Sequence, residues 1–88
     1  MNIHYQEKIL ASISKDKYSG CWIWKGQVSN SGYGKLMIKY DNNRTKTEGA
    51  QEVSYTGFIG PVPQGMFVKH VCGNQLCVNP EHLKIFKP

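Results

Sequence analysis

The feature that most limits how this chain can fold is a group of two cysteines and two histidines late in the sequence. They lie within thirteen residues, from His70 to His82. Four residues separate Cys72 from Cys77, so one loop can curl both sulfurs onto a single ion, as zinc-binding loops do. Because 88 residues allow only one domain with a small core, a bound ion would supply folding free energy that the core lacks. The pattern predicts a metal-stapled domain.

The third cysteine, Cys21, is the natural third sulfur ligand. Three is an odd number, so the cysteines cannot form a fully paired disulfide framework within one chain. With Cys21, Cys72 and Cys77, one imidazole completes a tetrahedral Cys₃His site for structural zinc. We prefer His82 as the fourth ligand and keep His70 as the alternative, because a zinc-bound imidazole has lost the lone pair that a general base uses. The competing interpretation is that the cysteines are small buried apolar residues.

The charge balance indicates a polyanionic partner. Eleven Lys and Arg against six Asp and Glu leave a net charge of +5, which creates a positive field that attracts nucleic acid. No apolar run approaches the roughly 20 residues needed to cross a bilayer. The first residues also lack the basic and then apolar pattern of a signal peptide. We therefore expect a cytoplasmic protein with no membrane partner.

The first half of the chain is predicted to form a helix and a hairpin. Residues 2–14 fit a short amphipathic helix, and residues 15–20 have the polarity of a loop. Residues 21–25 and 36–40 are rich in β-forming side chains, with turn residues between them. An antiparallel hairpin of these two segments is the simplest arrangement, followed by a turn at 41–44.

The second half continues with short elements of both kinds. Residues 45–47 are placed to pair once more with the hairpin. A helix is expected over 48–56, stopped by Gly57. The two prolines of 60–65 make that segment a rigid connector, and residues 66–71 read as a strand. The fold class is therefore α+β.

A composite motif runs through the second half, at residues 60–65, 68–72 and 77–83, and it is extended upstream by residues 21–24 and 32–35. Together these stretches resemble the HNH endonucleases common in phages and mobile elements, over about residues 20–85. The resemblance implies a ββα-metal nuclease core that acts on double-stranded DNA. It also implies a divalent cation, Mg²⁺ or Mn²⁺, on the scissile phosphate and a histidine that activates water.

The resemblance assigns roles to single residues. His70 matches the first histidine of the motif, the general base that takes a proton from water. Asn79 and His82 match the second half of the zinc-stapled variants. From the residues alone, His70 is also compatible with a hydrogen-bonded strand histidine, and Asn79 with a residue that opens a turn before Pro80.

The chain departs from the family pattern at two places. Gln51 and Glu52 stand where many relatives carry a His-Arg pair, so an imidazole and a cation are replaced by an amide and an anion. The family also places a helix with the last metal ligand after the position of Leu83, whereas this sequence continues only through residues 84–88. We expect that C-terminal helix to be missing.

Basic and aromatic side chains are the candidates for contact with DNA. The predicted phosphate-binding residues are Lys35, Lys39, Arg44, Lys46 and Lys69. Tyr33 and Tyr40 are candidates for base stacking, whereas core packing is the better interpretation for Trp22 and Trp24.

These observations predict one domain, residues 1–88, with an N-terminal helix and loop at 1–19 and an HNH-like core at 20–85. The first functional hypothesis is a metal-dependent DNA endonuclease or nickase, which includes the case of an enzyme with impaired catalysis. The alternative is a catalytically silent scaffold of phage origin that binds DNA or a protein and interferes with a host nuclease. A homodimer that completes the active site is compatible with both. A zinc finger regulator would need a recognition helix that the sequence does not contain.

Overall fold

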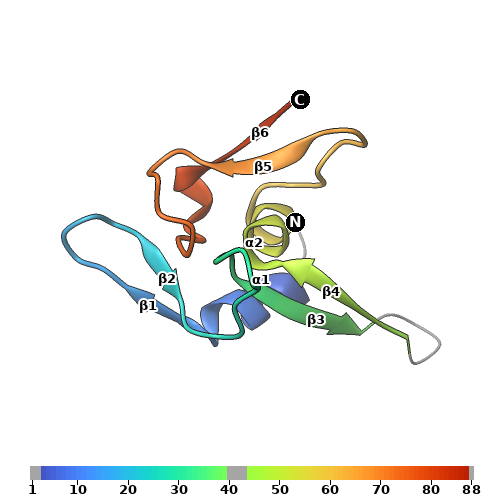
Figure 1. Cartoon of the computed structure of the whole chain (residues 1–88), viewed down its shortest axis with the longest axis horizontal. Helices are drawn as coiled ribbons and strands as arrows, with labels where there is room; N and C mark the ends of the chain where they lie inside the picture. The colour runs from blue at the N-terminus through green and yellow to red at the C-terminus, as the bar shows by residue number, and fades with distance from the viewer. Residues whose placement is uncertain (1–2, 40–43, 88) are drawn as a thin grey trace.

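The computed structural model describes residues 3–39 and 44–87, and these form the α+β fold that the sequence predicts. In chain order the elements are α1 (Ile3–Leu10), β1 (Ile13–Lys15), β2 (Trp22–Trp24), β3 (Lys35–Lys39), β4 (Thr45–Gly49), α2 (Ala50–Phe58), β5 (Phe67–His70), the single-turn helix η2 (Pro80–His82) and β6 (Leu83–Phe86). The strands pair as three antiparallel sheets of two strands each, β1 with β2, β3 with β4 and β5 with β6. Helix α2 lies in the middle, between the β3–β4 sheet and the β5–β6 sheet (Figure 1).

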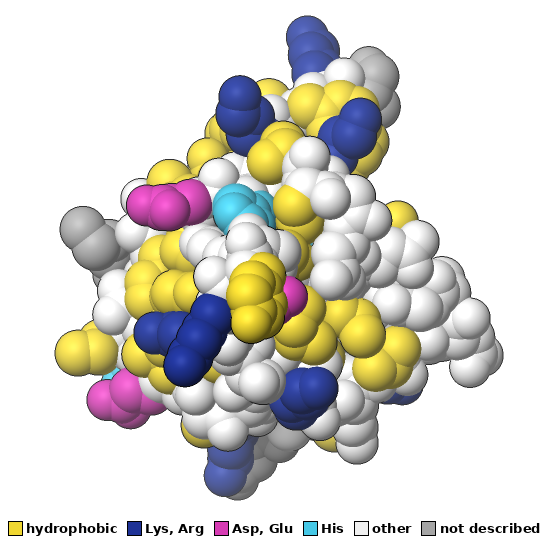
Figure 2. Space-filling model, turned by 90° about the vertical axis from the view of Figure 1, so that its left-hand side faces the viewer, with side chains coloured by type: hydrophobic (Ala, Val, Ile, Leu, Met, Phe, Trp, Pro, Cys, Tyr) yellow, Lys and Arg dark blue, Asp and Glu magenta, His cyan; other side chains and the backbone are white. Residues whose placement is uncertain are grey.

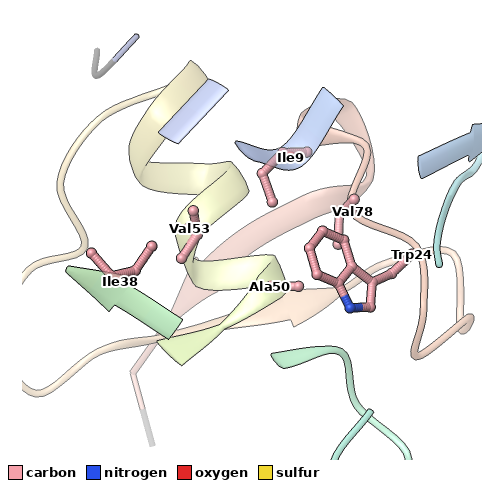
Figure 3. Close-up of a cluster of buried hydrophobic side chains, with 6 residues drawn as sticks. All are labelled: Ile9, Trp24, Ile38, Ala50, Val53 and Val78. Carbon is pink, nitrogen blue, oxygen red and sulfur yellow. The ribbon is translucent and has the colours of Figure 1, made fainter. Parts of the chain in front are cut away.

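The hydrophobic core surrounds α2 and draws side chains from most of the elements. Figure 3 shows Ala50 and Val53 of α2 with Ile38 on one side and Trp24 and Val78 on the other. Ile9 of α1 completes the cluster and is fully buried. The elements α1, β2, β3 and α2 therefore contribute one or two apolar side chains each to this cluster.

Trp24 lies in the core, as predicted, and it sets the identity of a neighbouring glycine. Its Nε1 donates a hydrogen bond to the carbonyl oxygen of Gln27 at 2.8 Å, so the buried indole is satisfied. A Cβ added at Gly34 would lie 2.6 Å from Cδ1 of Trp24. Gly34 is therefore required by the close approach of the indole and not by turn geometry. Trp22 is half-buried and packs edge-to-face with Phe58 at a ring-centroid distance of 5.4 Å.

The prediction of one helix over residues 2–14 is wrong for the last residues of that range. Helix α1 ends at Leu10, and Ile13 and Ser14 belong to β1, where they pair with Trp24 and Ile23. The apolar spacing of this segment is compatible with either structure. Pairing with β2 decides the outcome, because it satisfies backbone groups that would otherwise have no partner near the core.

The predicted hairpin of residues 21–25 with 36–40 is also wrong. Strand β2 pairs with β1, and β3 pairs with β4, in the register that joins Leu36 to Glu48 and Ile38 to Lys46. The pairing expected for residues 45–47 is confirmed. Strand β2 therefore pairs with the strand before it in the sequence, and β3 pairs with the strand after it. Tyr40 and residues 41–43, where a turn was predicted, lie outside the described residues.

Helix α2 is displaced by two residues from the predicted range 48–56. Glu48 and Gly49 complete β4, and the helix continues past Gly57 to Phe58. A Cβ at Gly57 would lie 3.0 Å from Cβ of Tyr5, so this glycine allows α1 and α2 to approach closely. Gln6 also donates a hydrogen bond from Nε2 to the carbonyl oxygen of Gly57 at 2.8 Å. Gly57 is thus a packing position and not a helix stop.

The strand expected at residues 66–71 is present as β5, and it pairs with β6 in the register that joins His70 to Leu83. Among the described residues, those that follow His82 form strand β6 and contain no helix. No helix in the described ranges is long and apolar enough to span a membrane.

Candidate metal centre and active-site pocket

The four preferred metal ligands converge on one point. Cys21 Sγ lies 3.7 Å from Cys72 Sγ and 3.6 Å from His82 Nδ1, and Cys77 Sγ lies 3.3 Å from the same nitrogen. All four ligand atoms lie within 4.8 Å of one another. A tetrahedral zinc ion, with Zn–S of about 2.3 Å and Zn–N of about 2.0 Å, separates two sulfurs by about 3.8 Å and a sulfur from a nitrogen by about 3.5 Å. The group therefore has the dimensions of a site that can hold a metal ion such as zinc.

Backbone pairing brings Cys77 next to Cys21. The N–H of Trp24 donates to the carbonyl oxygen of Leu76, and the N–H of Val78 donates to that of Trp22, each at 2.8 Å. The loop that carries Cys77 thus runs along β2, directly after Cys21. Ser54 of α2 donates a hydrogen bond to the carbonyl oxygen of Val78 and holds this loop against the central helix. Cys21 and Cys77 are both buried, whereas Cys72 is exposed.

Asn79 connects the backbone segments of two ligands. Its Nδ2 donates to the carbonyl oxygen of Gly20 at 2.6 Å, and its Oδ1 accepts from the N–H of Glu81 at 2.9 Å as the N-cap of η2. Gly20 directly precedes Cys21, and η2 ends at His82. Gly20 also has a φ of 75°, a conformation that favours glycine. Asn79 therefore holds the two ends of the metal centre in register, and it does not line the pocket of His70 described below.

The protonation of the thiols reflects their surroundings. Burial raises the pKa of the Cys77 thiol to about 12. Burial also raises the pKa of Cys72, but hydrogen bonds from the Asn74 backbone and from the other two thiols outweigh it, so this pKa is lowered overall. A metal ion binds the thiolate form, so a bound cation would deprotonate the buried sulfur.

His70 lies outside this group and lines a separate pocket of about 540 Å³. The pocket is formed by β5, the end of β6, the first turn of α2 and the two loops that contain Tyr33 and Gln75. Its lining residues are Tyr33, Gln51, Glu52, Phe67, Val68, Lys69, His70, Gly73, Gln75 and Phe86. Nε2 of His70 is buried and has no hydrogen-bond partner. Burial lowers the pKa of His70 below its ordinary value of 6.5, so the imidazole is neutral at pH 7.

Tyr33 and Gln51 are neighbours of His70 that sequence reasoning did not identify as such. The sequence suggests base stacking for Tyr33, but its ring packs on the imidazole of His70 with a centroid distance of 5.6 Å and an interplanar angle of 25°. Gln51 is visible in the sequence only as a departure from the family pattern. No spacing rule links residue 33 or 51 to residue 70, because tertiary packing alone brings them together.

Glu52 places a carboxylate in the same pocket. Burial raises the pKa of Glu52, nearby Glu48 raises it further, and Lys46 lowers it. Lys46 also forms an ion pair with Glu48 at 3.8 Å. The pocket therefore contains a carboxyl group from Glu52 and an amino group from Lys69 of β5.

The predicted phosphate-binding residues do not all lie on one face. In the β3–β4 register Lys46 is opposite Ile38, so it lies on the other face of the sheet from Lys35 and Lys39. Lys35 lines a different hollow, together with Lys8. Arg44 directly precedes β4. Of the five residues, Lys69 lines the pocket of His70, and Lys46 lies close enough to affect Glu52.

Two lysines, Lys69 and Lys84, lie on the β5–β6 sheet together with the exposed aromatic rings of Phe67 and Phe86. Phe67 and Phe86 pack edge-to-face with ring centroids 4.1 Å apart, and Lys69 Nζ lies 5.3 Å from the Phe86 ring centroid. Lys69 is directly opposite Lys84 across the sheet. At this end of the molecule the space-filling view shows Lys and Arg side chains around hydrophobic ones (Figure 2). Like charges in a cross-strand pair are unfavourable unless an anion neutralises them.

Comparison with known proteins agrees with the motif. Residues 48–87 match the sequence model of the HNH endonuclease family. The chain is 41% identical over 83 residues to Protein 2.8 of Escherichia phage T7, an alignment that covers 94% of this chain and 53% of the relative. It is 37% identical over 68 residues to Protein 7.7 of the same phage, covering 77% of this chain and 48% of the relative. The chain thus spans about half the length of these curated relatives. No solved structure matches it at a significant level.

Three of the four candidate metal ligands and His70 lie inside the matched segment, and Cys21 lies upstream of it. Gln51, Glu52 and the β5–β6 sheet are inside it as well. The motif, the α+β architecture and the phage relatives agree with one another. Residues 48–87 of this chain thus match the HNH endonuclease family, as the motif predicts.

Proposed function

We propose that the chain is a metal-dependent DNA endonuclease or nickase in which His70 is the general base. The observation that carries this proposal is the place of His70, which lines a pocket next to the Cys₃His group and whose Nε2 has no hydrogen-bond partner. The lowered pKa of His70 supports the same role, because a neutral imidazole can accept a proton at pH 7. Cleavage and DNA as the substrate are proposed from the match of residues 48–87 to the HNH endonuclease family together with this geometry.

The reaction is hydrolysis of a phosphodiester bond. The oxygen of a water molecule forms a bond to phosphorus while its proton passes to Nε2 of His70. The bond between phosphorus and the leaving deoxyribose oxygen breaks, and that oxygen keeps the electron pair and takes up a proton from solvent. Tyr33 keeps the plane of the imidazole fixed during the transfer, because its ring is stacked on it.

Two metal ions with different tasks fit this chain. Zinc at Cys21, Cys72, Cys77 and His82 would staple η2 and the Cys77 loop to β2, and its closed Cys₃His set leaves no open position for substrate. Mg²⁺ or Mn²⁺ is bound in nucleases by one or two carboxylates together with substrate phosphates. Glu52 is the carboxylate that lines the pocket, so it would be the protein ligand of that cation. When bound, such a cation stabilises negative charge on the phosphate.

Double-stranded DNA is the partner that the charges favour. Lys69 lines the pocket from β5 and is directly opposite Lys84 of β6, and the repulsion between these two lysines would be relieved by phosphate. Asn79 is proposed to support the metal centre, since its two hydrogen bonds join the segments of Cys21 and His82. As a phage-encoded protein, the chain would act in the cytoplasm of the bacterial host.

The decisive experiment is plasmid cleavage. Supercoiled plasmid incubated with Mg²⁺ or Mn²⁺ should become nicked or linear, and a chelator should stop the reaction. His70→Ala should abolish cleavage and leave the zinc content unchanged. Equal plasmid profiles for wild type and His70→Ala, at stoichiometric protein with either cation, would contradict the proposal.

A second candidate function is a catalytically silent scaffold that binds DNA or a protein, such as a factor that blocks a host nuclease. Glu52 favours it, because an anion in the pocket repels a phosphate unless a cation intervenes. Binding of DNA without cleavage would support this candidate. A flat response of DNA binding to salt would favour a protein partner or a second copy of the chain instead.

A further inference from the structure

The two faces of the β5–β6 sheet carry different kinds of side chain, because alternate residues of a strand point to opposite faces. The side chains of one face are buried or half-buried, and they belong to Val68, His70, Leu83 and Ile85. The side chains of the other face are all exposed, and they belong to Phe67, Lys69, Lys84 and Phe86. We call these four residues the outward face.

Two like pairs make up the outward face. Phe67 is directly opposite Phe86, and Lys69 is directly opposite Lys84. The solvated face of an antiparallel sheet normally carries polar side chains, so two phenyl rings that are 41% and 37% exposed are an exception. The ring centroids lie 4.1 Å apart, and Lys69 Nζ lies 5.3 Å from the Phe86 centroid. The rings therefore form one apolar surface beside two ammonium groups, at the end of the molecule where Figure 2 shows Lys and Arg side chains around hydrophobic ones.

The two lysines favour an anionic occupant for this face. Within the part of the chain that the structure describes, no carboxylate forms an ion pair with Lys69 or Lys84. Like charges directly opposite each other on two strands are unfavourable. An external polyanion would neutralise both ammonium groups at once, so charge complementarity points to nucleic acid.

The phenyl rings distinguish between the two forms of nucleic acid. In a duplex the bases are stacked on one another and present only their edges in the grooves, whereas an unpaired base presents its whole face. Stacking of such a base on an aromatic side chain strengthens binding about 5-fold to 100-fold. Lys69 follows Phe67 by two residues, about 7 Å along the strand. One extended nucleotide can therefore place its base on the ring and its phosphate at the ammonium group.

We propose that the outward face binds a single-stranded stretch of DNA, with bases stacked on Phe67 and Phe86 and phosphates at Lys69 and Lys84. Phe67, Lys69 and Phe86 also line the pocket of His70, so the bound strand leads directly to that pocket. This inference rests on the proposed nuclease function and names its substrate class. The substrate is DNA in which unpaired nucleotides adjoin the cleaved bond, such as a duplex with a single-stranded overhang.

The test compares the affinity for a labelled single strand of about 12 nucleotides with that for a blunt duplex of the same sequence. Fluorescence anisotropy measures both, without added Mg²⁺ or Mn²⁺ so that neither probe is cut. The double variant Phe67→Leu, Phe86→Leu keeps an apolar cover on the sheet and removes both rings. We expect it to lose about 5-fold to 100-fold in single-strand affinity and to keep its duplex affinity.

A matched control removes an aromatic ring elsewhere. Tyr18 is fully exposed and lies outside the pocket of His70, so Tyr18→Leu should leave the affinity for both probes unchanged. Circular dichroism and zinc content show whether the variants are folded.

A second measurement examines the lysines of the outward face. Lys84 does not line the pocket, so its replacement reports on this face alone. Lys84→Ala should flatten the plot of log single-strand affinity against log salt by about 0.7 units, the value for one lost phosphate contact. Lys39 is exposed on β3 and lies outside the pocket, and Lys39→Ala should leave the slope unchanged.

The possible outcomes separate this inference from the nuclease function. Equal single-strand affinity of the wild type and the double phenylalanine variant overturns the inference, and so do equal losses on single strand and duplex in a folded protein. Tighter binding of an RNA strand of the same sequence overturns DNA as the occupant. A wild type that cleaves no plasmid, but whose single-strand binding falls selectively in the double variant, overturns the nuclease function and supports the outward face as the binding site.

Discussion

Asn79 and Gly20 are joined by a hydrogen bond of 2.6 Å between the side-chain amide and the backbone carbonyl, across 59 positions of sequence. The same side chain caps η2. Asn79 thus joins the segments that carry Cys21 and His82 through hydrogen bonds to backbone groups and not to the ligand atoms themselves. Such supporting residues affect metal sites nearly as strongly as the ligands do.

Replacing Asn79 should therefore weaken the metal centre. Asn79→Ala removes the hydrogen bonds to Gly20 and Glu81, and at about 0.5 to 1.5 kcal/mol each their loss should lower the free energy of unfolding by about 1 to 3 kcal/mol. Zinc affinity should fall about 10-fold to 100-fold. Asn79→Asp keeps the acceptor for Glu81 and loses the donor for Gly20, so it should give an intermediate loss. Denaturant titration and competition with a chromogenic chelator measure the two effects, and a stable Asn79→Ala with normal zinc affinity would refute the assigned role.

The Cys₃His group should contain about one zinc ion per chain. Cys72 is exposed, so Cys72→Ala removes a ligand without opening the core, and it should abolish zinc binding and sharply lower the melting temperature. Val71 is an exposed neighbour, and Val71→Ala should change neither quantity. Elemental analysis and calorimetry make the comparison. A zinc-free wild type whose three thiols all react freely in the folded state would contradict this expectation.

The environment of His70 predicts how stability and activity depend on pH. Burial holds its folded pKa below the unfolded value of 6.5, so the unfolded chain binds more protons between these two values. Stability from this group is complete above pH 6.5 and is lost as the pH falls through the folded pKa. The cleavage rate should fall over the same interval, because the base must be neutral. The free energy of unfolding of the wild type, measured against that of His70→Gln, should therefore decrease as the pH falls below 6.5. A difference between the two proteins that does not change with pH would count against a lowered pKa.

The position of the lysines predicts which of them matter for DNA. Lys69 lines the pocket, whereas Lys35 lies at another hollow beside Lys8. If DNA lies over the pocket, Lys69→Ala should flatten the plot of log affinity against log salt by about one unit. Lys35→Ala should leave that slope unchanged. Titrations of a labelled duplex at several salt concentrations decide the matter, and the reverse order of effects would move the interface to the β3–β4 sheet.

Local chemistry was enough to predict several features from the sequence. The spacing of Cys72 and Cys77, the odd third thiol at Cys21 and the need of a short chain for a staple led to the metal group, because ligand chemistry depends on residue type and short loops. The strand before His70 and the proline connector followed from backbone propensities. The HNH motif followed from residues close together in the sequence.

Tertiary structure decided the rest, because those outcomes depend on contacts between residues far apart. Ile13 and Ser14 pair with β2 instead of continuing the expected helix, and β3 pairs with β4 instead of β2. The partner of a strand depends on which strand edges are free once the core has formed. Gly57 looked like a helix stop and serves as a contact for Tyr5. The sequence alone determined which side chains can bind a metal ion. Only the packing of α2 against β5 placed Gln51 and His70 in one pocket, because no periodicity along the chain encodes that meeting.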